Sequence, residues 1–180
     1  MTIDLGSIAK GYAGELAARA LHDKGVTSAL LNLGGNVQTI GSKPDGSAWI
    51  IGIKDPKNPD TAMMGLSVNN QAVVTSGGYE RYFEQDGLTY WHIMDPATGH
   101  PAKSGLLSVT VVGDKGGICD ALSTSLFVMG LDKAYDLWAK SDFEAVFVAT
   151  DGTVYITDGL KDKFSLAQGY EDTSVKILTR

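Results

Sequence analysis

The first segment with recognisable chemistry is a helix start that carries one lysine, Asp4-Leu5-Gly6-Ser7-Ile8-Ala9-Lys10-Gly11. Ser7 is a favourable N-cap residue, so an ordinary capped helix is one interpretation. Lys10 places a cation in the first turn, where the helix dipole opposes it by roughly 0.3–1 kcal/mol. A bound anion removes that opposition, because free backbone N–H groups at a helix start bind phosphates. The segment predicts a phosphate or diphosphate seat, although it is not a Walker P-loop, since Lys10 precedes Gly11.

A second candidate site lies on a nearly uncharged helix that contains Asp120-Ala121-Leu122-Ser123-Thr124. Asp120 is the only charged residue between Ile118 and Leu131, and at 100° per residue Ser123 and Thr124 project beside it. A carboxylate in so apolar an element needs a partner. Mg²⁺ suits these hard oxygen ligands and completes its shell with water and substrate phosphate. The alternative is an aspartate stabilised by the helix dipole alone, with both hydroxyls bonded to backbone carbonyls.

The third candidate is a histidine where a strand runs into a tight turn, in the sequence Tyr90-Trp91-His92-Ile93-Met94-Asp95-Pro96-Ala97-Thr98-Gly99. His92 is a candidate general base near neutral pH. The alternative is a structural hydrogen-bonding role in an ordinary turn. Two glycine pairs, Gly34-Gly35 and Gly77-Gly78, also follow predicted strands. Such pairs either let a ligand approach the backbone or let the chain twist out of a sheet.

Hydrophobic periodicity predicts the elements that position these residues. An amphipathic helix is predicted over 8–24, with an apolar stripe made of Ile8, Tyr12, Ala13, Leu16, Ala20 and Leu21 and with Gly25 at its end. Further helices are predicted over 118–129 and 133–140, and strands over 28–33, 49–53, 66–75, 89–94, 106–112, 145–149 and 153–156. The order of these helices and strands along the chain favours an α+β fold in which helices flank a largely antiparallel sheet. A length of 180 residues suits one domain covering 1–180.

Composition excludes some classes of partner and site. The formal charge is -6, from 15 basic and 21 acidic side chains, and no Lys/Arg cluster forms the stripe that a nucleic acid requires. We therefore expect no nucleic-acid partner. The single Cys119 lies in an apolar run, which indicates a buried thiol and excludes an internal disulfide. The printed residues contain neither an apolar run of the ~20 residues that a membrane span needs nor a secretory signal.

Five segments, taken in order, resemble the ApbE family of FAD:protein FMN transferases. They are DLGSIAKGYA (4–13), NLGGN (32–36), TSGGYERYF (75–83), HIMDPATGHP (92–101) and DALSTSLFVMG (120–130). The resemblance implies a T-fold-related α+β domain and a Mg²⁺-dependent reaction that moves FMN from FAD to a threonine hydroxyl and releases AMP. The implied acceptor is a flavoprotein such as a redox-pump or reductase subunit.

The resemblance also implies residue roles. His92 is the implied base, the FAD contacts are Asp4, Lys10 and Met94, and the metal neighbours are Ser7, Asp120, Ser123 and Thr124. Some relatives carry a second aspartate where this chain has Ser123, which leaves one charge fewer around the metal. Family members usually have a long segment before the first of these motifs, often with an export signal and a lipid-anchor cysteine. The implied location is therefore extracytoplasmic and membrane-anchored, through a segment that this chain lacks.

Alternative functions share some of these residues. Three short segments imitate, in order, the S-x-x-K, S-x-N and K-T-G elements of serine β-lactamases and penicillin-binding proteins: Ser7-Ile8-Ala9-Lys10, Ser67-Val68-Asn69 and Lys103-Ser104-Gly105. The third pattern lies in a predicted loop instead of a strand, which disfavours that class. Closer alternatives use the same site: with water as nucleophile it would hydrolyse FAD to FMN and AMP, and without catalysis it would be a flavin-binding fragment. Residue types alone do not separate these outcomes.

Overall fold

A seven-stranded sheet runs through the centre of the structure, a computed structural model that describes residues 3–180. In spatial order its strands are β1 (Ala29–Leu33), β2 (Asn36–Ile40), β5 (Ala72–Gly77), β10 (Leu106–Gly113), β11 (Glu144–Ala149), β12 (Val154–Thr157) and β14 (Val175–Leu178). Neighbouring strands are antiparallel except for β12 and β14, which are parallel. The predicted α+β fold with a largely antiparallel sheet is confirmed.

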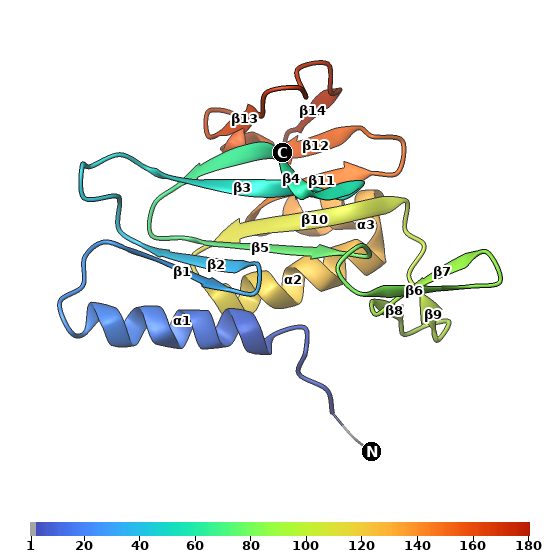
Figure 1. The fold of residues 1–180 in the computed structure, drawn as a ribbon, viewed down its shortest axis with the longest axis horizontal. Coiled ribbons are helices and arrows are strands. Elements are labelled where there is room, and N and C mark those ends of the chain that lie inside the picture. The colour runs from blue at the N-terminus through green and yellow to red at the C-terminus, as the bar shows by residue number, and fades with distance from the viewer. Residues whose placement is uncertain (1–2) are drawn as a thin grey trace.

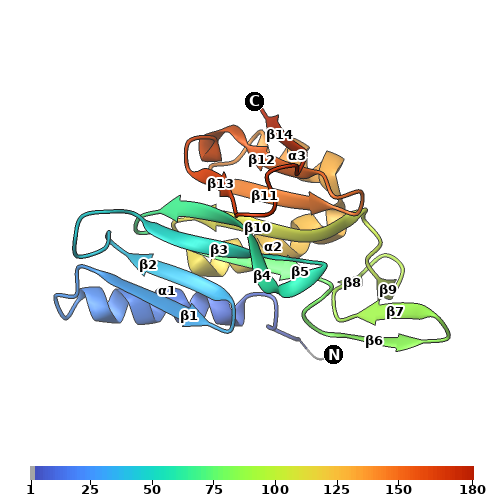
Figure 2. The same ribbon diagram turned by 45° about the horizontal axis from the view of Figure 1, so that its top comes forward.

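Two further layers cover the faces of this sheet (Figures 1 and 2). One face carries the helices α1 (Ala9–His22), α2 (Gly116–Met129) and α3 (Leu131–Trp138). The other carries a three-stranded sheet of β13 (Phe164–Leu166), β4 (Asn58–Val68) and β3 (Trp49–Asp55) and a short helix η1 (Asp158–Leu160). Two small hairpins extend from one end of the layers: β6 (Tyr82–Gln85) with β7 (Leu88–Trp91), and β8 (Met94–Asp95) with β9 (His100–Pro101). Among residues 3–180, no helix has the length and apolar character needed to cross a bilayer.

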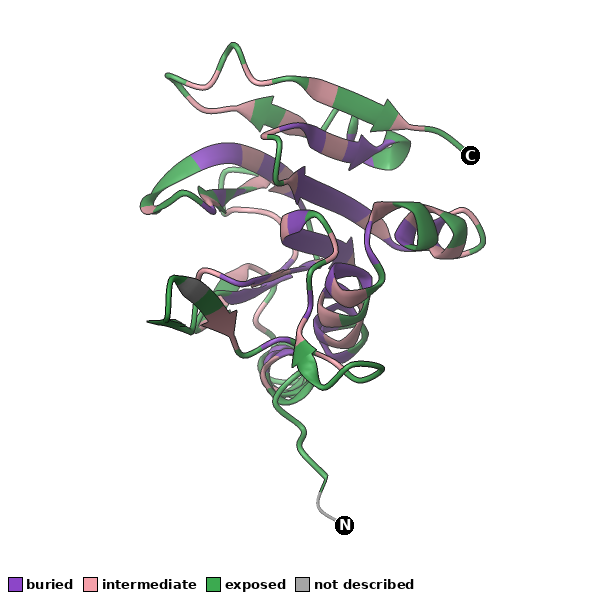
Figure 3. Cartoon of the chain, turned by 90° about the vertical axis from the view of Figure 1, so that its right-hand side faces the viewer, coloured by how far each residue is buried: buried purple, intermediate pink, exposed green. Residues whose placement is uncertain are grey.

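The hydrophobic core is divided between the two faces of the large sheet, as the buried central strands in Figure 3 show. Alternate residues of β10 supply the two halves, because successive side chains of a strand point to opposite faces. Val109 and Val111 pack with Leu126 and Phe127 on the helical side. Val112 packs on the other side, in the half that includes Met64, Leu66, Val68, Val148 and Ile156. Burial on both faces explains the nearly continuous apolar run of β10.

The predicted strand over 66–75 is wrong as a single element. Its first part belongs to β4 in the small sheet and its second part to β5 in the large one. Asn70 between them has φ of 53°, a left-handed conformation that asparagine tolerates better than most residues. The chain therefore turns at Asn70 and passes from one sheet to the other. The strand predicted over 89–94 also divides, because β7 ends at Trp91 and Met94 begins β8.

The predicted apolar stripe of α1 does not face the core. Gly11, Gly14 and Ala18 are the residues that α1 buries, whereas Tyr12 and Leu16 remain 54% and 42% exposed. The helix approaches α2 so closely that a Cβ at Gly11 would lie 2.1 Å from the carbonyl oxygen of Gly116. Only residues without large side chains permit this contact, so the larger apolar side chains turn outward.

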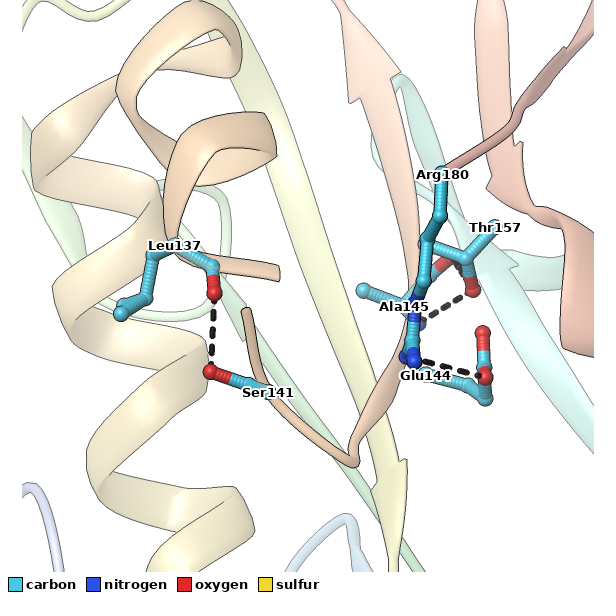
Figure 4. Close-up of polar contacts among 6 residues, drawn as sticks. All are labelled: Leu137, Ser141, Glu144, Ala145, Thr157 and Arg180. Atoms are coloured by element: carbon cyan, nitrogen blue, oxygen red, sulfur yellow. Dashed lines mark hydrogen bonds and ion pairs between the residues drawn. The ribbon is translucent and has the colours of Figure 1, made fainter. Parts of the chain in front are cut away.

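Several polar contacts lie around β11, in the C-terminal part of the chain (Figure 4). The backbone N–H of Ala145 donates to Thr157 Oγ1 at 2.9 Å, which links β11 to β12. Ser141 Oγ donates to the carbonyl of Leu137 at 2.8 Å just after α3, and Arg180 pairs with Glu144 at 3.8 Å. The ion pair with Glu144 holds the C-terminal residue against β11.

Candidate functional site

The first contact of the site joins α1 to α2. The backbone N–H of Gly11 donates to Asp120 Oδ2 at 2.7 Å, and Asp120 is only 4% exposed. A Cβ at Gly11 would lie 2.6 Å from Asp120 Cβ, so the two backbones are in close contact here. Lys10 precedes Gly11 and is half-buried. The structure thus brings the lysine-bearing helix start and the lone carboxylate of the second helix together, although they are more than 100 residues apart.

Hydroxyl groups gather one turn further along α2. Ser76 Oγ, at the end of β5, lies 2.8 Å from Ser123 Oγ and 3.0 Å from Thr124 Oγ1. Ser123 Oγ also donates to the backbone carbonyl of Asp120 at 2.9 Å. Ser76 is a candidate site residue that the sequence interpretation missed. The signal was present, because Ser76 belongs to the Thr75-Ser76-Gly77-Gly78 segment already singled out for its glycines.

The start of α1 differs from the prediction. Ile8, not Ser7, occupies the N-cap position, and no side chain caps the helix. A turn before the helix accounts for the shift: Asp4 Oδ1 accepts the N–H of Gly6 at 2.6 Å, and the carbonyl of Leu5 accepts the N–H groups of Ile8 and Ala9. Ser7 and Asp4 are both exposed and both lie outside the helix. Their assignments to the metal and to FAD remain predictions.

His92 is held by its neighbours while its ring stays exposed. Its backbone N–H and its Nδ1 both lie 3.2 Å from the carbonyl oxygen of Arg81. If Nδ1 carries the proton that this carbonyl accepts, Nε2 keeps its lone pair and is available as a base. The neighbouring Ile93 is 4% exposed and anchors the segment, so His92 and Met94 flank a buried residue and are both exposed.

The His92 segment connects to α2 through an aromatic contact. The rings of Trp91 and Phe127 meet edge to face with centroids 6.4 Å apart, and Phe127 lies one helical turn beyond Ser123. Trp91 also covers Gly78, where a Cβ would lie 2.9 Å from the indole ring. Beside this contact is a cavity of about 350 Å³ whose walls include Tyr79, Tyr82 and Trp91. The contacts link the histidine segment to the serine and threonine cluster by packing, not by direct hydrogen bonds.

The donor set beside Asp120 fits a magnesium ion. Only Oδ2 of the carboxylate takes a hydrogen bond from residues that the structure describes, and the hydroxyls of Ser76, Ser123 and Thr124 add neutral oxygen donors. Within residues 3–180 no three His, Cys, Asp or Glu side chains converge to form a metal site from such ligands alone. A site with one carboxylate therefore relies on water and substrate phosphates, which is how Mg²⁺ commonly binds.

Burial alters the acidity of two groups near the site. It raises the pKa of the Cys119 thiol to about 12, with further repulsion from Asp114, Glu15 and Asp120. Cys119 is 2% exposed and unpaired, which confirms the predicted buried thiol, and a thiol with this pKa is no nucleophile at neutral pH. Burial also raises the pKa of Tyr79 to about 12, so its hydroxyl stays protonated.

The β-lactamase-like arrangement is not formed. Ser67 lies in β4, in the small sheet, and α1, which follows Ser7, lies on the opposite face of the large sheet. The residues of that pattern therefore do not share a site.

Comparisons with known proteins find the same family that the sequence motifs resemble. A model of the ApbE family matches residues 1–147. The FAD:protein FMN transferase of Klebsiella pneumoniae (strain 342) is 41% identical over 174 residues, which are 95% of this chain and 53% of that protein. The protein of the same name from Treponema pallidum (strain Nichols) is 36% identical over 173 residues, 91% of this chain and 48% of that protein. The chain thus spans about half the length of these curated relatives.

Solved structures show the same likeness. The ApbE protein of Thermotoga maritima superimposes with a TM-score of 0.83 at 37% identity and covers 90% of this chain and 53% of that protein. The apo flavinyl transferase ApbE of Pseudomonas stutzeri gives a TM-score of 0.71 at 35% identity and covers 97% of this chain and 50% of that protein.

Proposed function

This chain belongs to the ApbE family, and on that premise we propose that it carries the catalytic motifs for Mg²⁺-dependent transfer of FMN from FAD to a threonine of an acceptor protein. The observation that carries the proposal is the hydrogen bond from Gly11 to Asp120. It joins the first turn of α1, which carries the lysine that suits a diphosphate, to the carboxylate that suits a cation. Those two groups are what the cleavage of a dinucleotide's diphosphate requires.

The substrate seat is built from both helices. Lys10 supplies the positive side chain for the diphosphate, and the exposed Asp4 precedes it at the entrance to α1. Asp120 already takes the N–H of Gly11, so the seat depends on Lys10 and on a bound cation more than on free helix amides. Mg²⁺ held by Asp120, Ser123 and Thr124, with Ser7 nearby, would offset the negative charge of the diphosphate. Met94 would contact the flavin from the His92 segment.

The reaction is a substitution at phosphorus. The acceptor threonine Oγ bonds to the FMN-side phosphorus, the bond to the bridging diphosphate oxygen breaks, and AMP leaves with that oxygen. His92 Nε2 takes the proton of the threonine hydroxyl as the bond forms. With Nδ1 donating to the carbonyl of Arg81, Nε2 is unprotonated and can take that proton.

The expected result of a direct assay is a fluorescent acceptor band on a denaturing gel after incubation of the protein with FAD, Mg²⁺ and an acceptor domain. Chelation of Mg²⁺, or replacement of the acceptor threonine with valine, should abolish the band. Free FMN and AMP without a labelled acceptor would favour the pyrophosphatase alternative. FAD binding without either product would favour a non-catalytic flavin-binding fragment.

Replacement of His92 with alanine is expected to lower transfer by about 10²–10⁴-fold, the usual contribution of a general base, with FAD affinity preserved. The matched control is His100→Ala, since His100 is also an exposed histidine and lies in the β8–β9 hairpin. Single-turnover rates and FAD titrations of both variants provide the measurement. Equal transfer rates in the two variants would remove His92 from the reaction.

The acceptor and location extend the same proposal. We expect a flavoprotein acceptor such as a redox-pump or reductase subunit, met outside the cytoplasmic membrane, as the family resemblance implies. Labelling of candidate acceptor subunits in the assay above distinguishes among them.

A further inference from the structure

Strand β2 carries a buried amide whose donor has no partner in the described chain. Asn36 is 4% exposed, and its Nδ2 makes no hydrogen bond within residues 3–180. Native proteins satisfy nearly all buried polar groups, so an unpaired donor calls for an explanation. Asn36 directly follows Gly34 and Gly35, which both have positive φ and form the tip of the β1–β2 hairpin.

The amide points toward the helical layer. Val37 packs in the half of the core that faces the small sheet, and the side chains before and after it must point the other way. Gln38 confirms this: its Cβ lies 3.7 Å from where a Cβ of Gly14 would be, and its Oε1 lies 3.1 Å from a Cβ built at Gly116. Asn36 shares this face with Gln38.

The position of Asn36 along α1 follows from the same contacts. Ala18 and Ile40 line one cavity between α1 and β2, and Gly14 contacts Gln38. Each turn of α1 thus corresponds to two residues of β2, with Ala18 near Ile40 and Gly14 near Gln38. Continued by one turn of α1 and two residues of β2, this correspondence sets Asn36 opposite Gly11. Gly11 is the residue whose N–H is bonded to Asp120.

The neighbouring strand leads to the same place. Val37 pairs with Val73 of β5, and the two strands run antiparallel. Because the strands are antiparallel, the residue before Val37, Asn36, lies on the side of β5 that leads toward Ser76. Ser76 contacts Ser123 and Thr124. Both registers therefore direct Asn36 toward the Gly11–Asp120 contact and the hydroxyl cluster.

We propose that Asn36 is a further substrate-binding residue, whose Nδ2 donates a hydrogen bond to a diphosphate oxygen of the bound dinucleotide. The inference rests on the proposed function, since it assigns the diphosphate to the seat beside Lys10 and Asp120. A neutral donor complements Lys10 there because it directs an N–H at an oxygen without adding charge that would repel the cation. The Asn36 amide, which is unpaired in the free protein, then gains its hydrogen-bond acceptor when the dinucleotide binds.

A structural water is the competing explanation. Gln38 Oε1 is also buried without a partner, and one water accepting from Asn36 and donating to Gln38 would satisfy both. The two explanations differ in what Asn36 and Gln38 variants do. A bridging water makes them equivalent, whereas a diphosphate contact involves Asn36 alone.

The test uses Asn36→Leu and Asn36→Asp, with Gln38→Leu as the matched control on the same face. FAD, ADP and riboflavin are titrated with Mg²⁺ present, and thermal stability is measured without ligand. Asn36→Leu should bind FAD and ADP about 10–100-fold more weakly, which corresponds to one lost hydrogen bond to a charged group. Riboflavin has no phosphate, so its affinity should not change. The melting temperature should stay the same or rise, because leucine removes an unpaired polar group.

The other possible results of these titrations each contradict a role for Asn36 in diphosphate binding. Equal FAD and ADP affinities in Asn36→Leu and the unmodified protein would overturn this inference and leave the proposed function intact. Equal losses in the Asn36 and Gln38 variants would support the structural water instead. Tighter Mg²⁺ binding by Asn36→Asp would assign the amide to the cation and not to phosphate. If the unmodified protein bound neither FAD nor ADP, both this inference and the proposed function would fall.

Discussion

Replacement of Asp120 with asparagine is expected to lower Mg²⁺-dependent FMN transfer by on the order of 10²–10³-fold, similar to the loss of one preorganised electrostatic contact. The fold should survive, because the amide oxygen of asparagine can still accept the N–H of Gly11 that Asp120 Oδ2 accepts now. What disappears is the charge that a cation needs. Asp120→Ala should lose activity as well but should also destabilise the protein, because Gly11 would lose its acceptor.

The matched control for this change is Asp114→Asn, which removes one negative charge from an exposed position just before α2. Transfer rates over a range of Mg²⁺ concentrations and melting temperatures provide the measurement. The Asp120 variant should require far more Mg²⁺ for half-maximal rate, and the control should not. A parallel loss of activity and melting temperature in Asp120→Asn would instead mean that the carboxylate only stabilises the fold.

Replacement of Gly11 with alanine is expected to cost about 1–3 kcal/mol of folding stability, the usual range for overpacking a well-filled core. The added Cβ would lie 2.1 Å from the carbonyl oxygen of Gly116 and 2.6 Å from Asp120 Cβ, so α1 and α2 must separate. For a chain of this size, each kcal/mol lowers the melting temperature by about 2–4 °C. Transfer should fall too, since the separation breaks the contact that joins Lys10 to Asp120.

Gly14→Ala is the control, because it makes the same change on the same helix face. Its Cβ would have its nearest neighbours at 3.7 and 3.8 Å, which is ordinary contact. Alanine is favoured over glycine within a helix by roughly 0.5–1 kcal/mol, so this variant should match or exceed the original stability. Thermal or chemical denaturation of both variants tests the comparison. Similar melting temperatures would show that the helices are not held at the Gly11–Gly116 contact.

The sequence was sufficient to place Asp120, Ser123 and Thr124 together, because helical periodicity fixes their relative directions without reference to the rest of the chain. It was insufficient for α1. Periodicity identified an apolar stripe there, but the buried face is formed by Gly11, Gly14 and Ala18. Close approach of two backbones selects small residues, and small residues carry little hydrophobic signal.

The remaining errors concern long-range contacts. Strand β2 was not predicted, because Asn36, Gln38 and Thr39 are polar and yet buried, so neither an apolar run nor a regular alternation marks the strand. Ser7 met every local requirement of an N-cap, but the turn that Asp4 and Leu5 form moved the helix start past it. Proximity of Ser76 to α2 depends on sheet order, which no local pattern reveals.

The outward side chains of α1 have a consequence for how copies of the molecule meet one another. Ile8, Tyr12 and Leu16 form an uncharged ridge on a molecule whose excess of six negative charges otherwise keeps copies apart. Mildly acidic solutions neutralise carboxylates and weaken that mutual repulsion, and concentrated salt screens it. Under either condition we expect copies to associate through this ridge, so solubility depends on the outer face of one helix as well as on the average composition.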